Sequence, residues 1–510
     1  MEEKCVKTPI FTFDTVFKDS AEVPIDIDFN LPDYCPEISR ILKCRAKARV
    51  SSASADEQRI SSDGVVTVTL IYADDENRIN SYEYQYPFSK SFESTTDISG
   101  AFIKARVRCE YINCRAVTER KVDIHGALGL SVTASMKKSR DIISDIDDIN
   151  IEVLRTLTPA TTPIGYASKY VIIEDEIEIG SSMPDIKCLI RYDAAIKTGE
   201  CKLLADKAIV KGELIVSLAY RDDDGEIQQL EESVPFSQLL EIEGVTEECE
   251  CQISADIAFL EIKPKFNSSS DSRSFSLGGK VLLQAEAYCQ GDVEVVTDAY
   301  SRLYEADVSG EDVYLNRLVC TINDTFNCRK EIEFPAGSIT KVCDIKSEAK
   351  VDSTNFKGDC LIVSGTAVCD ILAADETGAV AYYEKPVEFE YRYKLSVEGE
   401  NFTADPQVSV LSVGYTISGD IKMEIRLQMS LSAAVYKQNR VPVVSDIQVN
   451  ESRPIEKRNR GALTIYFAES GENIWGVARK YLADIDEVRR LNELSDDTLT
   501  GGQMLLIPVK

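Results

Sequence analysis

Apolar side chains alternate with other residues in three stretches of the chain, which begin at Gly64, Gly212 and Gly365. A period of two is typical of a β-strand with one buried face. We expect the intervening positions, such as Thr69, Ser217 and Asp370, to lie on a more exposed face. The apolar positions that agree between the three stretches are Val66, Val68, Leu70 and Tyr72; Leu214, Val216, Leu218 and Tyr220; and Ala367, Cys369, Ile371 and Ala373.

An acidic tetrad follows each stretch, at residues 74–77, 222–225 and 375–378, and a second alternating run follows each tetrad. Two alternating runs joined by a short polar segment predict a β-hairpin, here written three times. Calcium binding is the alternative interpretation of the acidic residues. None of the tetrads has the spacing of a twelve-residue EF-hand loop, and a solvated turn accounts equally well for Asp and Gly, so the turn is favoured and no metal site is predicted.

The repeat extends beyond the hairpins. Pro36-Glu37-Ile38 corresponds to Pro184-Asp185-Ile186, and strand-like segments close the units at 126–133, 279–286 and 423–430. The pattern predicts three all-β domains, each a sandwich, at residues 21–140, 170–290 and 320–437. The connecting segments 141–169 and 291–319 are mixed in character and receive no assignment.

The composition changes after the third unit. Residues 438–460 contain proline and are polar and locally basic, which predicts an exposed linker. In the module 461–510, the pattern predicts a strand at 463–467, a helix with Ile474, Val477, Ala478 and Tyr481 on one face, a second helix and a closing strand at 503–508. Asp484 to Glu487 is a capping box for the second helix, with Ile485, Val488 and Leu491 inward. The fold class is therefore mainly β, with a small α+β (βααβ) module at the end.

Charge and composition exclude several classes of partner. The chain of 510 residues has 57 basic and 86 acidic side chains, a formal net charge of −29, which disfavours nucleic acid and anionic lipid. The first residues have no basic and apolar export signal, and no run of about 18 apolar residues occurs, so we expect a cytoplasmic protein without a membrane span. The fifteen cysteines are then expected to be reduced thiols.

Catalytic chemistry has little support. His125 is the single histidine, and no nucleophile signature surrounds it or any cysteine, although a Cys–His pair is conceivable. Paired carboxylates are too abundant to single out one pair. We therefore predict no catalytic residue, no metal and no cofactor, and an enzyme ranks last among the functions considered.

The tandem β-units, with their strand, acidic turn and strand, resemble the SPOCS domains of SipL-like spore coat morphogenetic proteins. The C-terminal module resembles a LysM domain over its full length, through Ser470 to Ile474, Ala478, Tyr481, Asn492 and the ending 502–508. In the LysM family, N-acetylglucosamine polymers lie in a groove between two loops. One departure from the family is that its Asp-Thr is Glu472-Asn473 here, which weakens the case for sugar. The resemblance implies a partner- or glycan-binding groove formed by Gly471, Glu472, Asn473, Ile474, Trp475, Asn492, Glu493 and Leu494.

Trp475, the only tryptophan, lies about 100° from the apolar stripe of its helix. We expect part of its indole to be uncovered by the core of the module, which makes it a candidate hot spot for a partner. The other interpretation is that Trp475 is the rim of the core.

The resemblance implies a non-enzymatic scaffold for spore coat assembly in the mother-cell cytoplasm, at the forespore surface. Its LysM module would bind the coat-basement sporulation ATPase, and its repeats would contact other coat proteins. The alternative is a wall-associated protein that binds peptidoglycan.

Overall fold

The computed structural model describes residues 5–266, 272–335, 339–418, 421–455 and 463–508. Strands account for most of these residues, in agreement with the predicted fold class. In the first unit, six strands form two antiparallel three-stranded sheets, an outer sheet in the order β1-β6-β5 and an inner sheet in the order β2-β3-β4. The strands are β1 (Cys5–Asn30), β2 (Arg40–Asp56), β3 (Arg59–Ala73), β4 (Ile79–Glu93), β5 (Phe102–Ala116) and β6 (Lys121–Ile146).

The second and third units repeat this arrangement. The second has an outer sheet β7-β12-β11 and an inner sheet β8-β9-β10, and the third has an outer sheet around β13 and β19 and an inner sheet β14-β15-β16. Each unit encloses a hydrophobic core between its sheets, so the predicted sandwiches are confirmed. The strands are β7 (Ile151–Glu178), β8 (Cys188–Leu204), β9 (Lys207–Arg221), β10 (Ile227–Glu241), β11 (Glu250–Phe266), β12 (Ser272–Ser301), β13 (Tyr304–Glu333), β14 (Lys341–Lys357), β15 (Cys360–Ala374), β16 (Val380–Lys394), β17 (Phe402–Ala404), β18 (Gln407–Ser418) and β19 (Lys422–Pro454).

The three predicted hairpins are β3–β4, β9–β10 and β15–β16, and their alternating apolar residues are buried. The acidic tetrads are the turns. The first aspartate of each tetrad stabilises its own turn: Asp74 Oδ1 accepts hydrogen bonds from the backbone N–H groups of Glu76 and Arg78, and Asp375 Oδ1 accepts from those of Thr377 and Ala379. This use of the carboxylate accounts for aspartate at these positions without a calcium ion.

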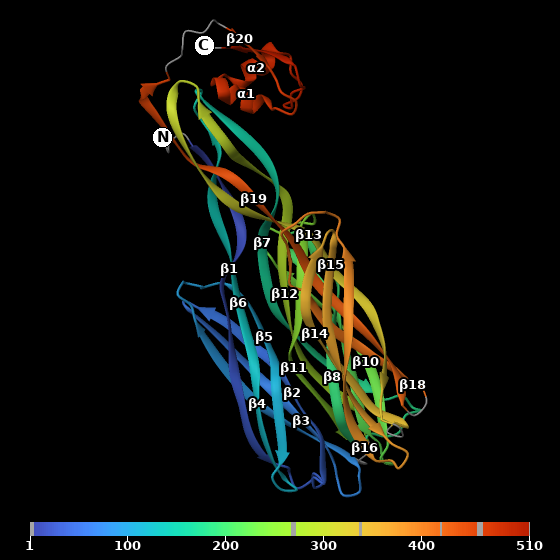
Figure 1. Cartoon of the computed structure of the whole chain (residues 1–510). Helices are drawn as coiled ribbons and strands as arrows, with labels where there is room; N and C mark the ends of the chain where they lie inside the picture. The colour runs from blue at the N-terminus through green and yellow to red at the C-terminus, as the bar shows by residue number, and fades with distance from the viewer. Residues whose placement is uncertain (1–4, 267–271, 336–338, 419–420, 456–462, 509–510) are drawn as a thin grey trace.

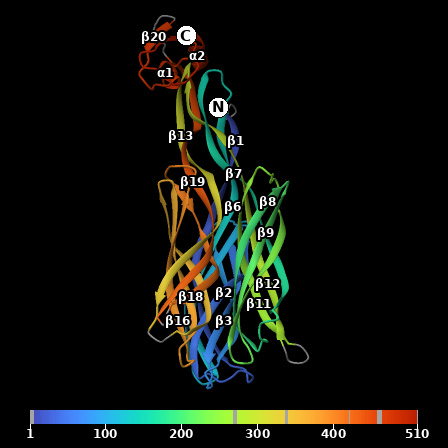
Figure 2. The ribbon, with the colours of Figure 1, turned by 90° about the vertical axis from the view of Figure 1, so that its right-hand side faces the viewer.

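The inner sheets of the three units pack together, so the second face of each hairpin is partly covered (Figure 2). Asp370 is buried, and its carboxylate forms an ion pair with Arg45 of the first unit at 3.0 Å. Lys47 pairs with Asp193, and Arg191 with Asp344 at 3.4 Å. The expectation of a more exposed face is confirmed for Thr69 and Ser217, which are half-buried beside fully buried neighbours, but it is wrong for Asp370. Packing between units, which no strand pattern encodes, covers this residue. An apolar cluster at the same interface takes residues from all three inner sheets: Ile71, Ile79, Ile190, Cys343, Leu372 and Val380.

The outer strands continue past the sandwiches as three two-stranded ribbons, formed by β1 with β6, β7 with β12 and β13 with β19. The ribbons pack together into a stalk through a shared apolar core, which includes Ile142, Val295 and Val443 (Figure 1). The unassigned segments 141–169 and 291–319 belong largely to these ribbons. The predicted linker 438–460 is wrong for residues 438–454, which are part of β19, because Val441, Val443 and Val444 are buried in the stalk. Residues 456–460 lie outside the described residues.

The C-terminal module has the predicted order, with β20 (Leu463–Phe467), α1 (Ile474–Tyr481), α2 (Ile485–Leu491) and β21 (Met504–Pro508). Its own core includes Ile474, Val477, Val488 and Leu505. Asp484 caps α2 by accepting a hydrogen bond from the backbone N–H of Glu487 at 2.9 Å, as the capping box predicts. The inward position predicted for Leu491 is wrong: this side chain is 41% exposed, since α2 ends here and the chain turns away at Asn492.

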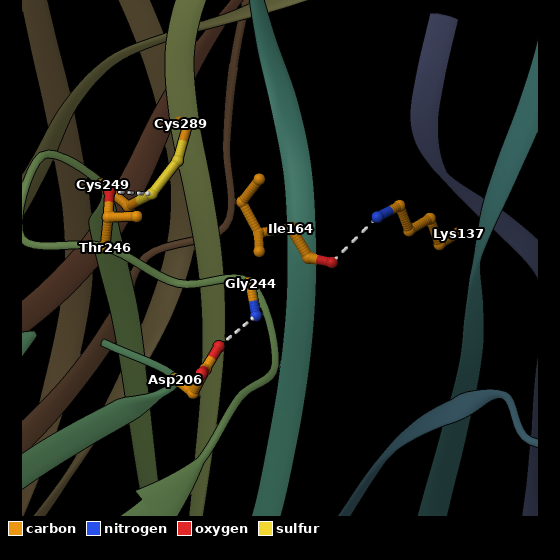
Figure 3. Close-up of a disulfide and its surroundings, with 7 residues drawn as sticks. All are labelled: Lys137, Ile164, Asp206, Gly244, Thr246, Cys249 and Cys289. Carbon is orange, nitrogen blue, oxygen red and sulfur yellow. Dashed lines mark hydrogen bonds between the residues drawn. A yellow bond between two sulfur atoms is a disulfide. The ribbon is translucent and has the colours of Figure 1, made fainter. Parts of the chain in front are cut away.

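One pair of cysteines is not reduced. A disulfide joins Cys249, in the segment before β11, to Cys289 of β12, whose Cα atoms are 4.4 Å apart (Figure 3). Thr246 lies beside it, with its hydroxyl 3.5 Å from the Cys249 sulfur. The expectation of reduced thiols throughout therefore does not hold for this pair, because the fold brings the two sulfur atoms together.

Candidate functional site

The predicted groove begins at the loop between β20 and α1. Gly471 adopts a φ of 86°, a conformation that glycine adopts without strain. Three backbone hydrogen bonds join this loop to residues 497–499: Gly471 N–H to Leu499, Leu499 N–H to Glu472, and Ile474 N–H to Asp497. The loop is therefore held against the segment that precedes the last strand.

Glu472 and Asn473, the residues that depart from the family pattern, both stabilise this loop. The carboxylate of Glu472 accepts hydrogen bonds from the backbone N–H of Glu469 and the hydroxyl of Tyr466, both at 2.8 Å. These bonds lower the pKa of Glu472. Asn473 caps α1, with its side-chain oxygen accepting from the backbone N–H of Gly476 at 2.7 Å. The substitutions therefore preserve a capped, ordered loop.

The second part of the predicted groove lies at the end of α2. The Asn492 side chain donates hydrogen bonds to the carbonyl oxygens of Val488 and Leu506, both at 2.8 Å, and accepts one from the backbone N–H of Leu506. Asn492 therefore holds α2 against β21. Glu493, with a φ of 49°, is exposed, and Leu494 is half-buried against the core of the module.

The structure divides the eight predicted residues by exposure. Gly471, Asn473 and Glu493 are exposed, and Glu472, Asn492 and Leu494 are half-buried. Ile474 and Trp475 are buried, with exposed fractions of 1% and 6%. Only the first six therefore present any surface to a ligand, and whether they bind one stays a prediction.

Trp475 contradicts the expectation of a solvent-exposed indole. Its ring packs against Tyr300 of β12, with 5.0 Å between the ring centroids. Its indole N–H donates a hydrogen bond to the carboxylate of Asp298 at 2.9 Å. The core of the module does leave this side chain uncovered, but the tip of the stalk covers it instead.

Further polar contacts surround the indole. The Tyr300 hydroxyl donates a hydrogen bond to the carbonyl oxygen of Ala483 at 2.6 Å, and Arg479 pairs with Asp298. Arg302 pairs with both Asp484 and Glu152. The module is thus docked on the second ribbon through an aromatic pair with charged residues at its rim.

Two carboxyl groups at this interface have shifted pKa values. Burial raises the pKa of Glu152. Burial also opposes ionisation of Asp484, but the N–H of Glu487 and the guanidinium of Arg302 outweigh it, so the pKa of Asp484 lies below its usual range. Asp484 is therefore a stable anion that serves both the helix cap and the interface.

Sequence reasoning missed Asp298, Tyr300 and Arg302, because they lie in the segment 291–319 that received no assignment. The one sequence signal for this contact is the position of Trp475, about 100° from the apolar stripe of its helix. It predicts that the core of the module leaves part of the indole uncovered and available to a partner, but not that the stalk of the same chain covers it.

Within the described ranges, one group of three side chains has the geometry to hold a metal ion: Asp26, Asp123 and His125. His125 Nδ1 lies 3.2 Å from Asp26, and its Nε2 lies 3.3 Å from Asp123. His125 is engaged with these two carboxylates and is more than half exposed, which offers no enclosed site for catalysis. None of the helices in the described part of the chain is long and apolar enough to cross a membrane.

Comparison with known families decides what the repeats and the module are. The family model of the SipL SPOCS domain matches residues 37–132 and 185–265, and that of the LysM domain matches residues 468–508. The chain therefore contains SPOCS and LysM domains. No curated protein and no solved structure matches it.

The SPOCS matches fall within the first two β-units and run from the segment before the inner sheet into the outer sheet. The third unit shares the strand order of its inner sheet with the first two. SPOCS and LysM are binding and scaffold domains. Together they fit a sporulation protein associated with the spore coat.

Proposed function

We propose that this SPOCS–LysM chain is a non-enzymatic scaffold for spore coat assembly. It would act in the mother-cell cytoplasm at the forespore surface. Its LysM module binds the coat-basement morphogenetic ATPase, and its three β-units contact further coat proteins.

The proposal rests on one observation: the LysM module is docked on the tip of the stalk with part of its predicted groove exposed. The contacts of Trp475 and Arg302 hold it on the tip of the stalk, while Gly471, Asn473 and Glu493 remain exposed. A small domain fixed at one end of a long β-scaffold suits a protein that brings two partners together, because linkage raises the effective concentration of the second partner.

The test is capture of the purified ATPase by the immobilised full chain. Glu493→Lys reverses a charge in the predicted groove. Glu451→Lys, the same change at an exposed position of β19, is the matched control. We expect Glu493→Lys to weaken capture and Glu451→Lys to leave it unchanged. Absence of capture by the unaltered chain would refute the assignment of the ATPase as partner.

A second candidate function is binding of peptidoglycan through N-acetylglucosamine polymers, and one observation favours it. Glu472 and Asn473 keep the first groove loop capped and ordered, so the departure from the family does not dismantle the loop. Sedimentation of the full chain with insoluble peptidoglycan separates the two functions. Retention on the glycan without capture of the ATPase would support the wall-associated protein.

A further inference from the structure

A cavity of about 710 Å³ lies at the base of the stalk, where the ribbons leave the sandwiches (Figure 1). Its lining takes residues from all three units, including Phe13 of β1, Glu286 of β12 and Tyr436 of β19, and none from the described part of the LysM module. Small-molecule sites typically enclose about 300–1,000 Å³. The cavity is therefore large enough for a ligand, and it is separate from the predicted groove of the module.

The charged side chains of the lining are unsuited to an ionic ligand. Lys104 of β5 pairs with Glu286, which is buried, and Arg106 pairs with Asp405 at 3.0 Å. The two remaining charged residues of the lining are exposed acids, Asp292 and Glu294. Because acids outnumber bases, an anionic ligand such as a phosphate ester would be repelled. A cationic ligand would find only solvated carboxylates free, and ion pairs with such groups contribute little.

The polar capacity that remains for a ligand is uncharged. Gln252 lies opposite Glu286 in the β11–β12 ladder, and its side-chain oxygen is buried without a hydrogen-bond partner in the described part of the chain. A ligand that donates a hydrogen bond would satisfy this acceptor. Ser254, Thr403 and Ser432 also line the cavity, and each hydroxyl group can donate one hydrogen bond and accept two. The lining therefore offers both donors and acceptors.

Aromatic rings complete the lining. Tyr288 and Tyr436 pack edge to face, with 5.9 Å between their ring centroids, and Phe13 contributes a third ring from another unit. A pyranose sugar has C–H groups on its faces, which pack on aromatic rings, and hydroxyl groups around its edge, which form hydrogen bonds. An aliphatic ligand, in contrast, would leave the amide of Gln252 and the hydroxyl groups unsatisfied. The combination of groups thus fits a neutral carbohydrate.

We propose that this cavity is a binding site for a neutral disaccharide. The buried oxygen of Gln252 accepts a hydrogen bond from a sugar hydroxyl, and the ring of Tyr436 packs against a sugar face. The inference does not rest on the function proposed above, since no described residue of the LysM module takes part. Because all three units line the cavity, a bound disaccharide also stabilises their arrangement, and the melting temperature of the chain rises with its concentration.

The test is saturation-transfer difference NMR of the full chain with cellobiose as the probe. Gln252→Met removes the amide at similar size, and Ser254→Phe fills part of the cavity. Gln238→Met is the matched control, because Gln238 is a half-buried glutamine of β10 in the same unit and lies outside the lining. We expect cellobiose to bind the unaltered chain and Gln238→Met equally, and to bind each cavity variant at least tenfold more weakly.

Absence of cellobiose binding by the unaltered chain would overturn the proposal. Binding that survives both cavity variants would place the disaccharide elsewhere and would overturn it as well. Spermidine, an organic cation, is the comparison ligand, and binding of spermidine without binding of cellobiose would show a site for cations instead.

Thermal melting is the second measurement and shows whether each variant is folded. Cellobiose should raise the melting temperature of the unaltered chain and of Gln238→Met, and should leave that of Gln252→Met and Ser254→Phe unchanged. An equal rise in all four proteins would be a general effect of the sugar on protein stability and would overturn the proposal.

Discussion

Phe88 lies directly opposite Gly64 in the β3–β4 ladder, and its ring occupies the space that a side chain on Gly64 would need. A Cβ atom on Gly64 would lie 2.2 Å from the Phe88 ring and 2.3 Å from the carbonyl oxygen of Arg49. The same pairing recurs at Gly212 with Phe236 and at Gly365 with Phe389. Packing therefore requires the glycine that begins each alternating stretch.

This relationship predicts that Gly64→Ala, Gly212→Ala and Gly365→Ala each destabilise the chain. Overpacking of a filled site typically costs about 1–3 kcal/mol. Thermal melting of the full chain measures the effect. Gly291→Ala is the control, since a Cβ there meets nothing within 4 Å. Equal melting temperatures for Gly64→Ala and Gly291→Ala would contradict the prediction.

Trp475, the only tryptophan, reports directly on the docking of the LysM module. Tyr300→Ala removes the ring that covers the indole, so fluorescence emission should shift to longer wavelength as water reaches it. The aromatic contact contributes about 1 kcal/mol beyond its buried area. Tyr314→Ala, at an exposed tyrosine of the third ribbon, is the control and should leave emission unchanged. An unshifted spectrum for Tyr300→Ala would show that the stalk does not cover Trp475.

The fragment 461–510 should fold alone, because its core of Ile474, Val477, Val488 and Leu505 is internal to the module. Asp484→Ala should lower its stability by about 1 kcal/mol, the usual effect of losing a helix N-cap. Thermal melting followed by far-ultraviolet circular dichroism measures both. A random-coil spectrum for the unaltered fragment would contradict the prediction.

The charges between the inner sheets predict a dependence of stability on pH. Burial opposes ionisation of Asp193, but Lys47 and Arg45 outweigh it and hold its pKa below the usual range. A carboxyl group with a lower pKa in the folded state contributes stability above its unfolded pKa, near 3.9, and loses it as the pH falls toward the folded value. Asp193→Asn should therefore melt at lower temperature at pH 7 and lose less stability than the unaltered chain below about pH 4.

Glu83 provides a control of opposite sign. Burial raises its pKa, so the ionised side chain costs stability at neutral pH, and that cost disappears as the pH falls through the folded pKa. Glu83→Gln should therefore raise the melting temperature at pH 7. The same direction of change for both variants at pH 7 would contradict the electrostatic explanation.

The pattern along the chain predicts the hairpins and the module because residues close in sequence determine both. Val66 to Tyr72 alternate within one strand, and the cap at Asp484 involves a residue three positions away. The second face of the hairpins could not be predicted in this way. Thr69, Ser217 and Asp370 occupy one position of the repeat, yet Asp370 is buried because Arg45, far away in sequence, lies against it.

In the candidate site, too, the sequence predicts the local features but not the contacts between units. The loops of the module follow from its family pattern and local caps, whereas the burial of Trp475 depends on Tyr300 in another unit. Residues 438–454 resembled a linker because the segment contains proline and is polar and locally basic. Only the neighbouring ribbons reveal that Val441 and Val443 face a core.

The paired ribbons have one consequence for geometry. Residues Ile151 to Pro163 of β7 run beside β12 along the stalk, and at about 3.3 Å per residue this part of the ribbon spans about 40 Å. Because side chains change face at every residue, the ribbons can be shortened only by an even number of residues per strand without inverting their buried sides. The length of the stalk can therefore change only in increments of about 7 Å, which is the rise of two residues along a strand. It sets how far a ligand of the LysM module is held from whatever the sandwiches contact, and it does so without altering either contact surface.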